Sequence, residues 1–432
     1  MSVGRIGRFE QAVAALEQRF FPALRRAADE PHMAAVREAI GPSFAALVAV
    51  TAVAWGVGHG ADLTTSFFAA YRAGFGAMGV ALAAFLAERL ARTFGYDRAL
   101  AVVLSLGAFY ISLPAESRLH PWTAIVQIAS TSIFLGLIVA LVTAQCLRIA
   151  YGLLPRFEAA AAATAASAAL FVLPAAAGFS LANLLLPIIK PLVAVGDTLP
   201  GLLIVVLLQT LLWCAGVHGP AFLSAIITPV YLHALDQNSQ AYLNHQTPPH
   251  IVTIALAVFY FPGGSGATLS LALLMLRSRV ARLRKLALAS LVPSLANINE
   301  PLIFGMPLVM NPTLALPFVG VPLILATLTY AAMAFGFVDK TVFWIPPINL
   351  LPAFVSAWIL TGRDWRAVVL IAVNVIIGAI AYAPFLRSFE SSISREPEQA
   401  EELVRSATAI REHELEVERH PERLLGDTHD DR

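Results

Sequence analysis

The chain has 432 residues, 58% of them hydrophobic, and a mean hydropathy of +0.72. This composition excludes an ordinary soluble globular protein, and the length suffices for about ten membrane crossings. The 29 basic and 28 acidic residues leave a formal net charge of +1 and form no basic face, so no nucleic-acid partner is expected.

Both cysteines, Cys146 and Cys214, lie in apolar segments. This setting predicts two inert buried thiols and argues against a disulfide framework or a metal site. The N-terminal region is charged and lacks an apolar core long enough for a cleavable signal peptide. The N-terminus is therefore expected to stay in the cytoplasm.

The N-terminal half begins with apolar residues at three- and four-residue spacing between positions 5 and 27. The pattern predicts an amphipathic helix at the membrane interface, with an ordinary packing helix as the alternative. Arginines follow the second and fourth of the next apolar segments, which places the N-terminus inside. Small residues crowd these segments and indicate a packing and oligomerisation module. We expect five crossings, at about 43 to 58, 64 to 87, 99 to 113, 121 to 146 and 158 to 177.

The next segment, 180 to 195, combines apolar stretches with Lys190 and two prolines, which favours a helix along the membrane surface. A sixth crossing is expected at 202 to 213, and the sequence GVHG follows it. The glycines around His218 allow a ligand to approach the backbone closely, whereas a lone histidine beside an apolar helix is more often structural. Both interpretations of His218 stay open on the residues alone.

A polar stretch at 233 to 250 carries three histidines, His233, His245 and His250. Their spacing fits no helical ligand pair, and no acidic cluster accompanies them. We therefore expect no metal and no other cofactor.

The segment from 251 to 276 is apolar on both arms, with Pro262 and three glycines in its middle, which predicts a broken helix. Backbone amides around Gly264, Ser265 and Thr268 are suited to bind hydroxyl groups. The Lys-Ser/Thr pair that completes a phosphate-binding loop is missing from this sequence.

The densest group of basic residues comes next and is called the basic cluster below. A cytoplasmic position is expected for it, and it is suited to meet a cytosolic partner or anionic lipid. A purely topological role is the alternative. The cluster consists of Arg277, Arg279, Arg282, Arg284 and Lys285.

The stretch 297 to 312, NINEPLIFGMPLVMNP, places a carboxylate and amides in sequence apolar enough for a bilayer. An ionisable group at membrane depth is costly and marks a functional site, so Glu300 is a candidate binding residue together with Asn299. The prolines and glycine of the stretch exclude one regular helix. They predict a broken or re-entrant hairpin at a binding site, with a surface loop as the alternative.

The closing crossings are expected at about 314 to 335 and 366 to 386. Between them, Trp344 precedes a proline pair and is either an interfacial belt tryptophan or a platform on which a sugar ring stacks. After Arg387 the chain becomes acidic, which predicts a solvated helix or a disordered tail.

Together these patterns predict an all-α polytopic membrane protein with about ten transmembrane helices, two re-entrant hairpins and amphipathic interfacial helices. We divide it into an interfacial N-terminal region (1–41), an oligomerisation half (42–178), a substrate-binding transport half (179–387) and an acidic cytoplasmic tail (388–432). Carboxylates, amides and imidazole each donate or accept hydrogen bonds and are suited to bind a polar ligand. The candidate binding set is Glu300, His218, Asn299, Trp344, Gly264 and Ser265.

The stretch 297 to 312 resembles the signature of the membrane-embedded enzyme IIC component of the bacterial phosphotransferase sugar transporters, in the lactose, cellobiose and diacetylchitobiose branch. Three further stretches resemble the same family in the same order, at 196 to 219, at 263 to 269 and around Trp344. The resemblance extends over about residues 15 to 387.

This resemblance implies a multi-pass permease of the bacterial inner membrane, with both termini cytoplasmic, that binds a β-linked disaccharide. Its sugar is phosphorylated at the 6-hydroxyl by a cysteine-phosphorylated cytosolic IIB subunit that works with IIA. Glu300 is implied as hydrogen-bond acceptor and possible general base, and His218 as a histidine that faces the sugar. The family usually has threonines after its tryptophan, whereas this chain has Ile345 and then Asn349, so the sugar preference does not carry over.

Neither cysteine lies in a reactive soluble setting, so the chain is not expected to carry the phosphate itself. Its expected partners are the sugar, membrane lipid, the IIB and IIA subunits and a second copy in a homodimer. One alternative is a sugar-sensing membrane module that signals through its tail. Another is a proton-coupled transporter with Glu300 as carrier.

Overall fold

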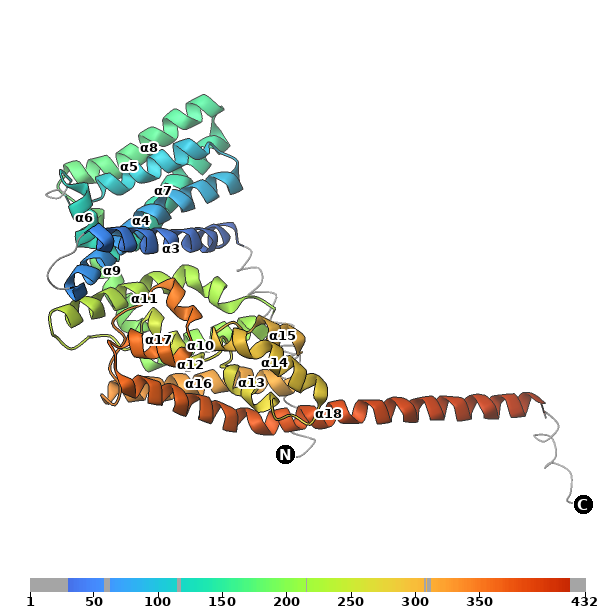
Figure 1. Ribbon diagram of the computed structural model, residues 1–432. Coiled ribbons are helices and arrows are strands. Elements are labelled where there is room, and N and C mark those ends of the chain that lie inside the picture. Colours follow the sequence, from blue (N-terminus) through green and yellow to red (C-terminus); the bar gives the residue numbers. More distant parts are fainter. Residues whose placement is uncertain are drawn as a thin grey trace, which may run out of the picture.

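The computed structural model of the chain describes residues 30–57, 63–114, 118–214, 216–306, 308 and 312–419. Over these residues every regular element is a helix, which confirms the predicted all-α fold (Figure 1). The predicted amphipathic helix at 5 to 27 lies outside them. The first half contains α3 (Pro31–Val57), α4 (Leu63–Phe94), α5 (Arg98–Ile111), α6 (Pro121–Ile128), α7 (Thr131–Leu153) and α8 (Arg156–Ala176).

The second half alternates long helices with short, interrupted ones. Its first elements are α9 (Leu181–Gly196), α10 (Leu199–Cys214), α11 (Gly219–Leu243), η2 (Ile254–Leu256), α12 (Ala257–Tyr260) and α13 (Leu269–Met275). The remaining elements are α14 (Ala281–Leu295), α15 (Glu300–Gly305), α16 (Pro312–Ala334), η3 (Pro346–Leu350), α17 (Ala353–Leu360) and α18 (Trp365–Arg419). The interruptions fall at 251–276 and 297–312, where the sequence predicted broken helices.

Six helices of the described chain are long and apolar enough to cross a membrane, and the pair α9–α10, bent by 79°, brings the number to at most seven. The expected number of about ten is not confirmed. One reason is that α5 has only 14 residues. At 1.5 Å per residue it covers roughly 21 Å, short of the ~30 Å hydrocarbon core. A second reason is that the segment 251–276 forms no continuous helix.

In the first half, α4 packs against α3, α5 and α7. Two glycines allow α4 and α7 to approach closely. A Cβ atom on Gly136 of α7 would overlap the carbonyl oxygen of Gly79 of α4, and one on Gly79 would overlap Ser132. In lipid, helices associate through such close packing, because lipid tails are as apolar as the helix surfaces. The predicted helix packing through small residues is therefore seen within this half.

The segment 121 to 146 forms two helices and not the single crossing expected. Ala129 divides it into α6 and α7 and has a φ of 38°. A positive φ is unfavourable for a residue with a side chain, so tertiary contacts must hold this bend. One such contact is the hydroxyl of Ser130, which donates to Asp236 Oδ2 of α11 at 2.6 Å. The break thus joins the two halves of the chain.

The C-terminal helix α18 continues far beyond the closing crossing that the sequence predicts. Its apolar part is Trp365–Ile393, and the helix then runs on to Arg419 and projects from the body (Figure 1). Of the two alternatives for the acidic segment, the helix therefore holds as far as Arg419. At the other end of the chain, α3 begins at Pro31 and runs across the expected domain boundary at residue 41.

Replacement of Gly136 by Ala should destabilise the first half, because the added methyl group overlaps the backbone of α4. Overpacking of this kind costs about 1–3 kcal/mol. The matched control is Gly107→Ala in α5, where a Cβ atom meets nothing within 4 Å. Thermal unfolding of the purified protein should occur at a lower temperature for Gly136→Ala and should be unchanged or slightly higher for Gly107→Ala. Equal unfolding temperatures would contradict the close α4–α7 contact.

Candidate functional site

The glycine-rich break between α12 and α13 forms a tight loop. Gly263, Gly264 and Gly266 have φ values of 83°, 93° and 84°, a region that disfavours any side chain. The hydroxyl of Thr268 donates to the carbonyl oxygen of Gly263 at 2.7 Å and closes the loop. At Gly264 a Cβ atom would lie 2.8 Å from Asn299 Cγ. Gly264 therefore serves close approach to the stretch 297–312.

Asn299 makes that approach through a hydrogen bond. Its Nδ2 donates to the carbonyl oxygen of Ser265 at 2.6 Å, and its side chain is buried. The residue directly precedes α15 without capping it. The structure thus brings three of the predicted site residues, Gly264, Ser265 and Asn299, into direct contact.

Asn297 connects three segments and was not among the predicted site residues. Its Oδ1 accepts a hydrogen bond from the Gly263 amide at 3.0 Å. Its Nδ2 donates to the carbonyl oxygens of Asn349 at 2.9 Å and of Leu351 at 3.2 Å. Its φ is 58°, a conformation that asparagine tolerates better than most residues. One carboxamide therefore joins the glycine loop, the segment 297–312 and the segment after Trp344.

Trp344 is held from both sides. Its Nε1 donates to Asn349 Oδ1 at 2.9 Å, and its ring meets Phe44 edge-on at 5.3 Å between centroids. The hydroxyl of Tyr71 donates to its carbonyl oxygen. The side chain is only 4% exposed, which does not fit a tryptophan at the lipid–water interface. Asn349, the residue that departs from the family pattern, is the partner that fixes the indole.

His218 directly precedes α11 and caps it, because its Nδ1 accepts a hydrogen bond from the Ala221 amide at 3.1 Å. In the neutral ring the proton therefore lies on Nε2, which is a donor. The indole of Trp213 packs on the imidazole, with 4.6 Å between centroids and 51° between planes. The partly exposed Glu300 interacts electrostatically with the same imidazole.

The structure therefore connects the six predicted site residues in two groups. Asn299 lies on the glycine loop with Gly264 and Ser265, and Trp344 is linked to that loop through Asn349 and Asn297. His218 and Glu300 form the second group, and Glu300 is the chain neighbour of Asn299. Sequence reasoning missed Asn297, Asn349 and Trp213. The first of these had a usable signal, since it is an amide in the same apolar stretch.

The three histidines of the polar stretch 233 to 250 differ in their partners. His233 Nδ1 lies 2.9 Å from the Ser130 hydroxyl. His250 lies 3.0 Å from Asp197 Oδ2 and also contacts Gln237. These two histidines therefore belong to a hydrogen-bonded network between helices.

A separate cavity of about 660 Å³ lies between α4, α7, α9 and α11. None of the six predicted site residues lines it.

The chain is apolar and helical, and its discontinuous helices carry buried amides, an imidazole and a carboxylate. These features are typical of polytopic membrane transporters, which place their binding groups on broken helices. The chain matches the family "Phosphotransferase system, EIIC" over residues 38–322 and belongs to that family. It is a multi-pass sugar permease component of the phosphotransferase system.

Proteins similar to this chain are IIC components of the same family. The chain is 31% identical to the lichenan permease IIC component of Bacillus subtilis (strain 168), over 79% of this chain and 82% of that protein. It is 30% identical to the cellobiose-specific EIIC component of Geobacillus stearothermophilus, over 74% of this chain and 78% of that protein. The crystal structure of ChbC, the IIC component of the N,N'-diacetylchitobiose-specific system, has the same fold, with a TM-score of 0.74, 24% identity and coverage of 89% of this chain and 99% of that one.

Replacement of Asn297 by Asp should loosen the site. The new carboxylate still accepts from the Gly263 amide, but its second oxygen faces the carbonyl oxygens that Nδ2 now binds. Unsatisfied or repelling buried polar groups cost about 1–3 kcal/mol each. We expect a lower unfolding temperature in calorimetry and a loss of sugar affinity of about tenfold or more. Wild-type values of both would show that the Asn297 bridge does not hold the site.

Proposed function

We propose that this EIIC chain binds a β-linked disaccharide, of the cellobiose, lactose or diacetylchitobiose type, at the site around Glu300, and moves it across the membrane. Transport is coupled to phosphorylation of the sugar 6-hydroxyl by a separate IIB subunit. The observation that carries the proposal is the convergence of the glycine loop, the stretch 297–312 and Trp344 on the Asn297 and Asn299 amides. The names of the similar permeases, for lichenan and for cellobiose, support the sugar class.

In this proposal each polar group has one role. Glu300 accepts a hydrogen bond from the 6-hydroxyl and acts as general base when that hydroxyl attacks the phosphoryl group. His218 donates from Nε2 to a second hydroxyl, since Nδ1 is engaged with Ala221. Asn299, Ser265 and Gly264 shape the loop beneath the sugar. Trp344 is buried in this conformation, so it serves as the apolar surface for a pyranose ring once the site opens around it.

The phosphoryl group itself comes from the IIB subunit. Both cysteines of the chain are partly buried and unpaired, and they lie in α7 and α10, within apolar helices. The chain therefore binds and positions the acceptor hydroxyl, and IIA supplies IIB with phosphate.

The two alternative functions have different support. The comparisons give no support to a sensor without transport, because the similar proteins named are permease components. A proton-coupled transporter rests on Glu300 alone. Uptake measured with and without a pH gradient separates it from phosphotransfer.

For orientation and assembly we propose cytoplasmic termini and a homodimer formed through the first half. The basic cluster, the α4–α5 link and the projecting part of α18 lie at the same end of the molecule in Figure 1. Positive residues gather on the cytoplasmic side of membrane proteins. Exposed apolar side chains of α8, such as Leu170 and Leu173, are available to a second copy or to lipid.

Substitutions at Glu300 and His218 test the binding site. Glu300→Gln removes the charged acceptor, and His218→Ala removes the Nε2 donor. A hydrogen bond to a charged group contributes about 1.5–3 kcal/mol and a neutral one about 0.5–1.5 kcal/mol. Disaccharide affinity should therefore fall at least tenfold in Glu300→Gln and about two- to tenfold in His218→Ala. His218→Asn is the matched variant, because asparagine can still cap α11. It should restore the unfolding temperature lost in His218→Ala but not the affinity. Wild-type affinity in Glu300→Gln and His218→Ala would overturn the proposed site.

Substitutions in the basic cluster test the coupling to IIB. Arg282, Arg284 and Lys285 are exposed on α14, where positive charge can steer an acidic face of a transient partner. With all three replaced by Gln, equilibrium sugar binding should persist, while phosphorylation by IIB slows and loses its salt dependence. An unchanged rate at low salt would assign the cluster to topology alone. A cysteine introduced at the exposed Ala281 checks, through its labelling from the cytoplasmic side, that the topology is unchanged.

A further inference from the structure

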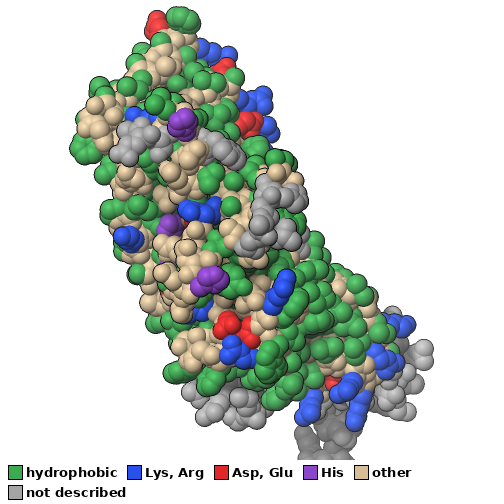
Figure 2. All heavy atoms as spheres, turned by 60° about the vertical axis from the view of Figure 1, so that its left-hand side comes forward, with side chains coloured by type: hydrophobic (Ala, Val, Ile, Leu, Met, Phe, Trp, Pro, Cys, Tyr) green, Lys and Arg blue, Asp and Glu red, His purple; other side chains and the backbone are tan. Residues whose placement is uncertain are grey.

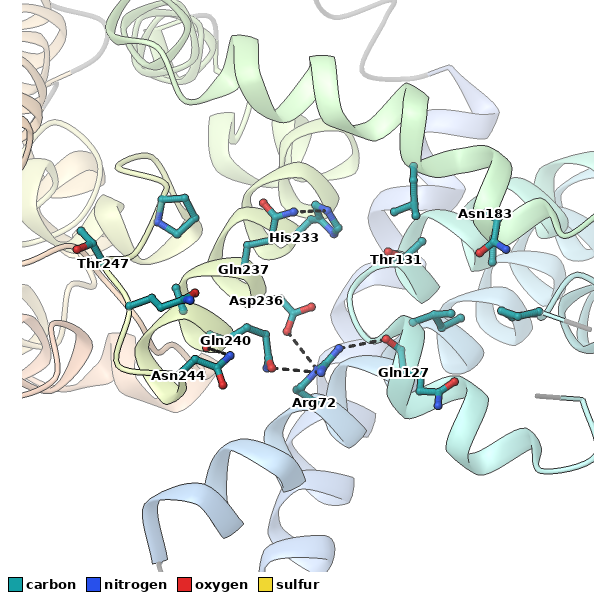
Figure 3. A pocket seen from close by; sticks show the side chains of 17 residues that line it. Arg72, Gln127, Thr131, Asn183, His233, Asp236, Gln237, Gln240, Asn244 and Thr247 are labelled. Carbon is teal, nitrogen blue, oxygen red and sulfur yellow. Dashed lines mark hydrogen bonds and ion pairs between the residues drawn. The ribbon is translucent and has the colours of Figure 1, made fainter. Parts of the chain in front are cut away.

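The cavity of about 660 Å³ has walls from both halves of the chain (Figure 3). Arg72, Gln127 and Thr131 of the first half lie across from α11 and the segment that follows it. Asn183 of α9 closes one end, and Thr247 lies at the other. The volume is in the range of pockets that bind small molecules, roughly 300–1,000 Å³.

Most of the lining surface is apolar, and the polar side chains within it are balanced in charge. Its charged side chains are Arg72 and Asp236, whose Nε and Oδ1 atoms are 3.8 Å apart. Side-chain amides supply most of the remaining polar groups. Each amide can both donate and accept, as a sugar hydroxyl requires. A neutral wall rich in amides suits a neutral polyhydroxylated ligand better than an ion. These amide residues are Gln127, Asn183, Gln237, Gln240, Asn244 and Gln246.

Several polar atoms in this wall are buried and make no hydrogen bond to the described residues. They are Arg72 Nε, Asp236 Oδ1 and Gln240 Nε2. The other oxygen of Asp236 is held by the Ser130 hydroxyl at 2.6 Å, and Arg72 also donates to Gln240 Oε1 at 3.2 Å. Unpaired buried polar groups are unfavourable and call for a partner. A hydroxyl group between Nε and Oδ1 can accept from the first and donate to the second once the partly exposed Arg72 side chain turns outward.

We propose that this cavity is a second sugar-binding site, an entry site that takes a neutral oligosaccharide before it reaches the site around Glu300. The inference rests on the proposed function for its sugar class. The described lining contains no phenylalanine, tyrosine or tryptophan, so the sugar is held without a large stacking ring, and binding is weak and exchanges rapidly.

The position of the cavity fits this role. The segment 243–250 and the α6–α7 link lie at the end of the helices opposite α14 and the projecting part of α18 (Figure 1). In the orientation proposed above, this end faces the outside of the cell. On this side Figure 2 shows histidines and charged side chains among polar surface, next to a broad hydrophobic region. Because both halves line the cavity, a bound sugar also bridges them.

The test is protection of a cysteine by sugar in the full-length purified protein. The parent carries Glu300→Gln, to remove binding at the inner site, together with Cys146→Ala and Cys214→Ala. Thr247→Cys places a thiol in the cavity lining, and Thr123→Cys places one on exposed α6 outside it. A water-soluble maleimide then reports the accessibility of each thiol, with cellobiose added at millimolar concentrations. Glycine betaine at equal osmolality controls for solvent effects.

We expect cellobiose to slow labelling at position 247 about tenfold when its concentration is about nine times Kd, and to leave position 123 unchanged. If cellobiose does not protect position 247, the entry site is overturned. The proposed function still stands in that case, provided that the protein with native Glu300 binds and transports sugar in a Glu300-dependent way. Equal slowing at position 123 or by betaine also overturns it. If Glu300→Gln binds sugar like the wild type, the proposed function fails instead.

A blocking variant gives a second, independent measurement. Asn183→Trp fills one end of the cavity from an exposed position, and Leu184→Trp, 50% exposed on the same helix and outside the lining, is its control. Asn183→Trp should abolish the protection at position 247 and raise the transport KM several-fold, with equilibrium affinity at the Glu300 site unchanged. Protection that survives in Asn183→Trp contradicts the proposal.

Discussion

The carboxamide of Asn297 supports the whole site, because it satisfies backbone groups that broken helices leave unpaired. A helix interrupted at membrane depth exposes amide and carbonyl groups that lipid cannot hydrogen-bond. Asn297 pairs one such amide, at Gly263, and two such carbonyls, at Asn349 and Leu351. A single side chain thereby turns three irregular segments into one rigid unit. The broken helices allow polar groups to point at a ligand, and the hydrogen bonds of Asn297 stabilise these broken segments.

Contacts between the halves are polar and specific as well. Tyr71 of α4 donates to the carbonyl oxygen of Trp344, and Phe44 of α3 packs against its indole. Next to Tyr71 on the same helix, Arg72 meets Asp236 of α11, which also accepts from Ser130. A transport cycle that moves one half against the other must therefore break these polar contacts. Sugar bound to either region can bias that motion only through a difference in affinity between the two arrangements.

His218 illustrates how a structural and a functional role can share one side chain. Its Nδ1 caps α11 and so determines which nitrogen of the neutral ring carries the proton. The Trp213 indole limits the orientation of the ring. The two interpretations open on the sequence, a structural histidine and a ligand-facing one, are therefore compatible. A cap that leaves Nε2 free to donate serves both stability and recognition.

The class of the protein follows from its amino-acid sequence. Long apolar segments require helices in lipid, and clustered prolines and glycines require breaks, so the all-α membrane fold and the breaks at 251–276 and 297–312 follow from local chemistry. Which polar groups are satisfied internally depends on the folded arrangement. The Ala129 bend, the roles of Asn297 and Asn349 and the cavity beside Arg72 depend on contacts between segments far apart in the chain. Hydropathy and residue spacing describe one segment at a time, and they carry no information on which distant groups will pair.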